Sequence, residues 1–189
     1  NLFQVPYTDL IDNDFFLKGK WREEYFKNNN PIILELGCGK GDYTVGLAKK
    51  YENKNFIGVD IKGARLWRGC KTAIEENMDN VAFLRCHVQM IESYFAPKEI
   101  DEIWITFPDP QPKNENKRLT CERFLDKYKN VLNDKGIVHL KTDNYDLYQY
   151  TVDLLKEKHI EILFSTDDLY HSFFTEDVIE IQTFYENMY

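Results

Sequence analysis

The sequence predicts an α/β fold built on a mostly parallel sheet, because short apolar segments alternate with amphipathic ones along most of the chain. A glycine-rich loop follows the first apolar segment, and a helical pattern with apolar positions three and four apart follows that loop. Such alternation is typical of parallel strands whose crossover helices cover both faces of the sheet. We expect seven strands, at 32–36, 55–60, 81–86, 102–106, 136–141, 160–165 and 178–184, and helices at 43–51, 63–77, 90–95, 121–132 and 145–156.

The last two expected strands lie close together in the sequence, and residues 166–175 between them are too irregular for a crossover helix. We therefore expect an antiparallel strand at that edge of the sheet. Residues 1–30 form an arm outside the α/β core, and residues 31–189 form one domain. The arm is expected to pack on the domain through five aromatic residues while three basic ones face outward: Phe15, Phe16, Trp21, Tyr25 and Phe26, and Lys18, Lys20 and Arg22.

Composition narrows the class of protein. No apolar run approaches the roughly 20 residues that cross a bilayer, and no basic stretch leads into an apolar one at the N-terminus. The four cysteines are far apart, which argues against a metal site or a disulfide framework. These features indicate a cytoplasmic protein with reduced thiols and no metal, and they leave open whether it is a monomer or a homodimer.

The charge is unevenly distributed. The chain carries a net charge of −8, which opposes nucleic-acid binding, but residues 113–129 hold six basic side chains against three acidic ones. Residues 165–189 hold six acidic side chains and no Lys or Arg. A basic patch and an acidic C-terminal end are therefore both expected.

The loop after the first strand has features of a cofactor site. Its sequence from Glu35 to Gly41 reads ELGCGKG, so three glycines can bring backbone N–H groups close to a ligand at a helix N-terminus. A dinucleotide loop would need a glycine where Asp42 stands. Glu35 and Asp42 make the loop acidic, which suits a cationic methionine sulfonium and its amino group and repels a pyrophosphate. Asp60 ends the second strand, where its carboxylate can accept both ribose hydroxyls of an adenosine. The alternative is a tight turn beside a solvated carboxylate.

A second loop places Asp109 between Pro108 and Pro110, directly after the fourth strand. The two prolines fix the backbone on both sides of this carboxylate. Alone, the motif could be a rigid turn. Its position at the carboxyl ends of parallel strands, where α/β proteins bind ligands, favours a functional site.

Four motifs in order, ELGCGKG (35–41), FPDPQPK (107–113), HLKTDN (139–144) and QTFYE (182–186), resemble the bacterial tRNA (guanine-N7-)-methyltransferases over nearly the whole chain. These are class I S-adenosylmethionine-dependent methyltransferases with a Rossmann-like domain. The resemblance implies that Asp109 is the catalytic residue and lies beside the cofactor, and that the target is a guanine in the variable loop of tRNA. It further implies cofactor contacts from Glu35, Gly37, Gly39, Gly41, Asp60 and His87, and substrate contacts from Lys113, Asp143, Thr183 and Glu186.

Several alternatives remain open. His87 could end its strand without touching a ligand, and Thr183 and Glu186 could simply close an edge strand. The chain departs from the family at three places: Gln111, where Trp is usual; His87, in a segment where Asp or Asn often lies near the adenine; and a thinner basic run. In that run, Lys113, Lys117 and Arg118 are expected to hold phosphates. A methyltransferase acting on a small molecule or a protein, or a non-catalytic RNA-binding relative, would keep the same fold.

Overall fold

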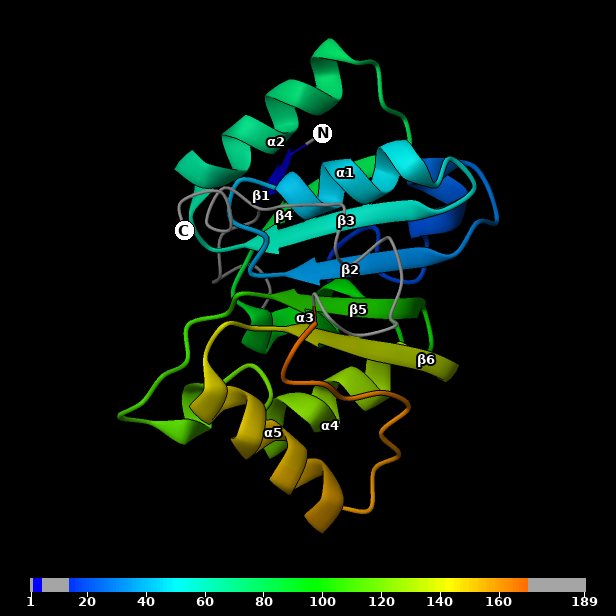
Figure 1. Ribbon diagram of the computed structural model, residues 1–189. Coiled ribbons are helices and arrows are strands. Elements are labelled where there is room, and N and C mark those ends of the chain that lie inside the picture. The colour runs from blue at the N-terminus through cyan, green and yellow to red at the C-terminus, as the bar shows by residue number, and fades with distance from the viewer. Residues whose placement is uncertain (1, 5–13, 170–189) are drawn as a thin grey trace.

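The computed structural model describes residues 2–4 and 14–169. Their centre is a six-stranded, all-parallel sheet in the order β1-β4-β3-β2-β5-β6 (Figure 1). Its strands are β1 (Leu2–Gln4), β2 (Ile32–Leu36), β3 (Asn55–Asp60), β4 (Val81–Arg85), β5 (Ile100–Thr106) and β6 (Leu132–Lys141). The α-helices are α1 (Asp42–Lys50), α2 (Gly63–Glu75), α3 (Ile91–Tyr94), α4 (Glu122–Val131) and α5 (Tyr145–Glu157). A π-helix, η2 (Trp21–Phe26), and two 3-10 helices, η3 (Val88–Met90) and η4 (Glu115–Lys117), complete the helical elements of the described residues.

Helices cover both faces of the sheet, as predicted. Successive side chains of a strand point to opposite faces, so each strand contributes to two cores. Ile33 and Phe83 belong to the core that α1 and α2 cover. Leu34 and Leu84, one residue further along the same strands, belong to the core formed with α3, α4 and the N-terminal arm. This α/β class is the one that the sequence predicts.

The described sheet has one strand at the N-terminal end that was not expected, and it lacks one that was. Leu2–Gln4 pairs in parallel with β4, so part of the arm belongs to the sheet. Residues 160–165 form no strand in the described chain, so that prediction was wrong. Leu163 and Phe164 are 67% and 44% exposed there, so this apolar run is not buried in the sheet. The expected antiparallel strand at 178–184 lies outside the described residues.

The arm packs through its aromatic residues. Trp21 is fully buried, and its indole Nε1 donates a hydrogen bond to the carbonyl of Tyr94 at 3.0 Å. Phe15 and Phe26 are buried with it, whereas Phe16 is 62% exposed. Burial of an indole together with its N–H partner fixes both position and orientation of the arm on the domain.

Arg22 was expected to face solvent, and this prediction was wrong. Its Nη2 lies 2.6 Å from a carboxylate oxygen of Asp101, and its Nε donates to the carbonyl of Asn30. The same Asp101 oxygen accepts the backbone N–H of Ile32 at the start of β2. The guanidinium therefore joins the arm to the sheet, because a half-buried carboxylate between strands needs donors.

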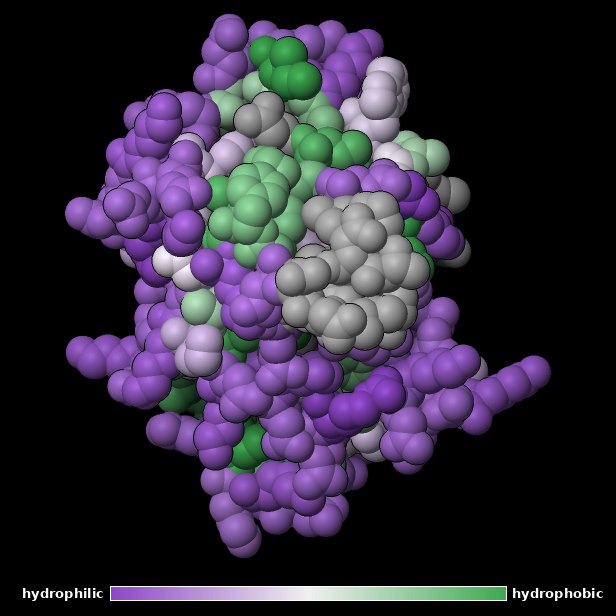
Figure 2. All heavy atoms as spheres, turned by 180° about the vertical axis from the view of Figure 1, so that it is seen from behind, coloured by the Kyte–Doolittle hydropathy of each residue, from purple (hydrophilic) through white to green (hydrophobic). Residues whose placement is uncertain are grey.

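All strands of the sheet end at one edge, which we call the carboxyl edge and which lies at the left of Figure 1. Seen from behind, the surface is mainly hydrophilic, with apolar residues gathered in its upper half (Figure 2). No described helix is both long and apolar enough to span a membrane.

Candidate cofactor and substrate site

Three glycines shape the loop between β2 and α1. Gly37, Gly39 and Gly41 have φ values of +75°, +56° and +77°, a left-handed conformation that other residues adopt at a cost. A Cβ on Gly41 would lie 2.5 Å from Cε1 of Phe83, so no larger residue fits there. A Cβ on Gly39 would meet nothing within 4 Å, which places this backbone next to open space. The loop thus combines a fixed turn with room for a ligand.

Asp60, at the end of β3, holds that loop in place. One of its carboxylate oxygens accepts the backbone N–H of Gly39 at 2.9 Å, and the other accepts that of Lys62 at 2.7 Å. The side chain is 8% exposed. A carboxylate offers about four lone-pair positions, so after these two bonds it can still accept two hydroxyl donors.

Glu35, in β2 just before the glycine loop, bonds to both α1 and β5 and is only 4% exposed. One carboxylate oxygen accepts from the backbone N–H and the hydroxyl of Thr44 in α1, and the other accepts from the hydroxyl of Thr106 in β5 at 2.7 Å. Burial raises the pKa of Glu35 from 4.5 to about 7, although these hydrogen bonds favour the charged form. The sequence predicted an acidic residue here but gave no sign that Thr44 and Thr106 would be its donors.

The Phe-Pro-Asp-Pro loop leaves β5 at the same edge. Asp109 is exposed, and its Oδ1 accepts the backbone N–H of Gln111 at 3.1 Å. Phe107 and Gln111 both have positive φ values, +46° and +47°, so the loop is bent on each side of the carboxylate. Since β5 is paired with β2, this carboxylate stands on the strand next to the glycine loop.

Lys141 is a site residue that the sequence analysis missed. It ends β6 with 7% exposure, and its Nζ lies 3.0 Å from the hydroxyl of Tyr43 in α1. The ammonium also lies 5.5 Å from the ring centroid of Phe107, and the carbonyl of Lys141 accepts the N–H of Phe107. The side chain therefore connects the Phe-Pro-Asp-Pro loop to α1, the helix that follows the glycine loop. Its strand position was predictable, but its partners come from distant parts of the chain.

Arg118 was expected to grip phosphate, but the structure gives it a different role. The side chain is buried, with its guanidinium 4.3 Å from the ring centroid of Tyr150 in α5. Its Nε donates to the carbonyl of Pro110, the residue after Asp109, and its Nη1 bonds Glu115. Arg118 thus supports the loop that carries Asp109. Lys113 and Lys117 are exposed and remain suited to phosphate.

Replacing Arg118 by Lys is expected to lower the free energy of unfolding by about 1.5–3 kcal/mol, the range for hydrogen bonds to a charged group. Lysine keeps the charge but loses the planar stack on Tyr150 and the Nε donor to Pro110. Urea unfolding would measure the change. Lys117→Gln, an exposed neighbour, is the control and should unfold as the original protein does. Equal stability of Arg118→Lys and the original chain would contradict this role.

The remaining predicted residues divide into three groups. Asp143 is exposed in the loop after β6, directly before Asn144, which caps α5 by accepting the N–H of Leu147. His87 is exposed at the end of β4, next to β3, and makes no side-chain cap to η3. Thr183 and Glu186 lie outside the described residues. The carboxyl edge therefore gathers Asp60, His87, Asp109, Lys113 and Asp143 with the glycine loop.

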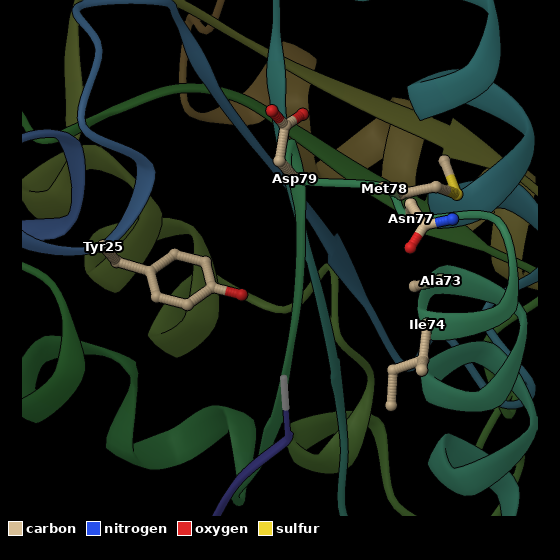
Figure 3. A pocket seen from close by; sticks show the side chains of 6 residues that line it. All are labelled: Tyr25, Ala73, Ile74, Asn77, Met78 and Asp79. Atoms are coloured by element: carbon tan, nitrogen blue, oxygen red, sulfur yellow. The ribbon is translucent and has the colours of Figure 1, made fainter.

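A recess of about 340 Å³ lies elsewhere (Figure 3). Tyr25, Asn77 and Asp79 are among its lining residues, together with Ala73, Ile74 and Met78. Tyr25 donates to the carbonyl of Val81, the first residue of β4. The recess thus opens at the amino end of that strand, and it contains none of the predicted site residues.

Comparison with known proteins agrees with this geometry. Residues 29–188 match a protein-family model described as "Putative methyltransferase". The chain is 56% identical over 192 residues to the tRNA (guanine-N(7)-)-methyltransferase of Christiangramia forsetii, covering 100% of this chain and 86% of that protein. It is 47% identical over 189 residues to the enzyme of the same name from Bacteroides fragilis, covering 100% of this chain and 75% of that one.

Among solved structures, an antibiotic-related methyltransferase superposes with a TM-score of 0.56 over 72% of each chain. At 17% identity this likeness concerns the fold alone. The relatives, in contrast, match the whole chain at high identity. From the carboxyl-edge site and these full-length matches together, it follows that the chain belongs to the tRNA (guanine-N7-)-methyltransferase family.

Proposed function

We propose that this protein transfers a methyl group from S-adenosylmethionine to N7 of a guanine in the variable loop of tRNA. The observation that carries the proposal is the position of Asp109. Its exposed carboxylate follows β5, and the neighbouring strand β2 leads into the glycine loop. The names of the full-length relatives support the same reaction. Because we take tRNA to be its substrate, we place the activity in the cytoplasm. We expect the active protein to be a monomer or a homodimer.

The residues of the carboxyl edge fit S-adenosylmethionine. The open space above Gly39 leaves room for a ligand against the loop backbone, and Asp60 keeps lone pairs for the two ribose hydroxyls. Glu35 beneath the loop supplies negative potential for a cationic sulfonium and amino group. His87 stands at the adjacent strand end, where an adenine would lie.

Methyl transfer to N7 requires alignment more than proton transfer. S-adenosylmethionine supplies an electrophilic methyl group, and guanine N7 has an in-plane lone pair and no proton to lose. Asp109 orients the base and stabilises the positive charge that develops on the purine. Arg118 and Lys141 hold the loop that carries this carboxylate, so it is positioned before the substrate arrives.

A guanine inside an RNA helix presents N7 in a deep groove that proteins reach poorly, so the target must lie in a loop or be turned out. Lys113 and Lys117 are exposed in the segment that follows Asp109 and can hold the flanking phosphates. Asp143 can accept hydrogen bonds from the guanine N1–H and 2-amino groups, a role we extend to Thr183 and Glu186.

Incubation with labelled S-adenosylmethionine and unmodified tRNA, followed by mapping of the methylated nucleoside, tests this function. We expect 7-methylguanosine in the variable loop. Label on a different atom, or on protein or small molecules but not on tRNA, would refute it.

Replacing Asp60 by Ala is expected to weaken S-adenosylmethionine binding by about 1.5–3 kcal/mol, because two charge-assisted acceptors are lost and the Gly39 loop is released. Isothermal calorimetry measures the affinity. Asp79→Ala removes a carboxylate at the opposite edge of the sheet and should leave the affinity unchanged. If both variants bind the cofactor like the original protein, Asp60 is not a ligand.

A further inference from the structure

The strongest concentration of positive charge in the chain is on α2 rather than after β5. Residues 61–74 contain Lys62, Arg65, Arg68 and Lys71 and no acidic residue, in a chain with a net charge of −8. Arg85, at the end of the neighbouring strand β4, approaches the start of the helix, since a Cβ on Gly63 would lie 3.2 Å from its side chain. The helix therefore begins inside a cluster of basic residues.

An exposed indole lies within this cluster. Trp67 is 59% exposed, whereas the other two tryptophans, Trp21 and Trp104, are 0% and 7% exposed. The ammonium of Lys71, one turn further along α2, lies 5.5 Å from the centroid of the Trp67 ring. The buried side of α2 carries Leu66, Cys70 and Ala73, and Trp67 lies on the opposite side. Packing of the protein core therefore does not explain why a tryptophan stands at this position.

Trp67, Arg68 and Lys71 share the solvent side of the helix, because residues three and four apart are neighbours on its surface. Ala64 precedes Trp67 by one turn and is also exposed. Helical side chains lean toward the N-terminus, so the large ring lies over a small neighbour that leaves space beside it. We call Lys62, Trp67, Arg68 and Lys71 the α2 basic face. Arg85 adjoins it, with its guanidinium bonded to the carbonyl of Ile61 and to Gln4.

The α2 basic face adjoins the site. Figure 1 shows α2 starting at the arrowhead of β3, on the edge from which the loop after β5 also departs. β3 and β5 both pair with β2, so the starts of the two segments are separated by roughly 10 Å at the sheet, two strand spacings. The glycine loop lies between them. Exposed basic residues thus flank it on both sides, at α2 and at Lys113 and Lys117.

Resting on the proposed function, we propose that the α2 basic face is a second contact surface for the tRNA substrate. Arg68 and Lys71 hold backbone phosphates, and Trp67 stacks on an unpaired base. Lys71 also lies 3.6 Å from the exposed carboxylate of Glu75, a solvent-exposed pair that is weak and leaves the ammonium accessible to a phosphate. Clustered positive charge complements phosphate, and aromatic rings interleaved with basic residues are the usual means of holding single-stranded nucleotides. Arg22 and Arg118 were expected to bind phosphate, but their guanidinium groups are bonded within the protein. The α2 basic face provides positive charge for tRNA in their place.

Two variants separate the two kinds of contact, and a third is their control. Arg68→Gln/Lys71→Gln should bind tRNA with a salt dependence of log affinity that is shallower by about 1.4–1.8, the loss of two phosphate contacts. Trp67→Ala should bind about 5- to 150-fold more weakly at fixed salt, with the slope unchanged, as expected for one stacked base. Lys135→Gln/Lys156→Gln removes the same charge from exposed positions on β6 and α5, and should bind tRNA like the original protein.

Fluorescence anisotropy with an unmodified tRNA transcript measures these affinities, and calorimetry with S-adenosylmethionine verifies that each variant retains its cofactor site. If the original protein binds and methylates tRNA while both α2 variants match its affinity and slope, the α2 proposal is wrong and the proposed function stands. If the original protein neither binds nor methylates tRNA, the proposed function itself fails. Loss of self-association in sedimentation, with tRNA affinity unchanged, would assign the face to contact between copies and overturn the proposal.

Discussion

Replacing Asp109 by Asn is expected to reduce the single-turnover rate of methyl transfer by about 10²- to 10³-fold, the usual effect of removing one preorganised electrostatic group. The carboxamide keeps the shape and can still accept the N–H of Gln111, so the loop should hold its conformation. What it lacks is the negative charge that balances the charge developing on guanine. The affinity for tRNA should therefore change much less than the rate.

The pH dependence distinguishes this role from proton abstraction. Guanine N7 carries no proton, so with saturating cofactor the rate of the original protein should be flat from about pH 7.5 to 9. Rapid-quench assays with labelled cofactor across this range supply the measurement, and Asp126→Asn, an exposed change on α4, is the matched control. A rate that rises tenfold per pH unit would indicate a general base, and an undiminished rate in Asp109→Asn would exclude this residue from catalysis.

The sequence predicted the fold well where its elements are long and regular. The strands ending at Leu36, Asp60 and Thr106 have buried, β-branched patterns that admit few alternatives, and their ends define the ligand edge. β1 was missed because three residues are too few to show a period. Residues 160–165 were wrongly assigned to a strand because an apolar run alone cannot reveal whether a neighbour is available for pairing.

The candidate site was predictable to the extent that it follows from strand ends and glycine spacing. The structure places Asp60, Asp109 and the three glycines on one edge, as the motifs imply. The supports of that site were not predictable. In the sequence, Arg118 belongs to a basic run. Only the tertiary fold brings its guanidinium to the carbonyl of Pro110 and to the ring of Tyr150. Contacts between residues far apart in sequence leave no local pattern.

Glu35 provides the second large expected effect, because it is a carboxyl group buried beneath the glycine loop. Burial raises its pKa from 4.5 to about 7, with Asp42 adding a smaller repulsion. Between these two pH values the folded protein holds a proton that the unfolded chain has lost. The free energy of unfolding should therefore fall as the pH rises through this window and level off above pH 7, by about 3 kcal/mol in all.

Glu35→Gln tests this linkage, because glutamine is neutral at every pH, its amide oxygen can still accept from Thr44, and its amide N–H can donate to the hydroxyl of Thr106. From about pH 5.5 to 8, the original protein should lose about 2 kcal/mol of stability more than Glu35→Gln does, as measured by urea unfolding. Binding of the cationic cofactor should favour the ionised carboxylate of Glu35. Calorimetry in two buffers near pH 6 should therefore detect the release of up to roughly one proton per cofactor bound. Glu35→Gln should release no proton at this position. Parallel pH profiles of stability for the two proteins would mean that Glu35 is already ionised in the folded state. It would then act as a fixed acceptor for Thr44 and Thr106, with no proton to release when the cofactor binds.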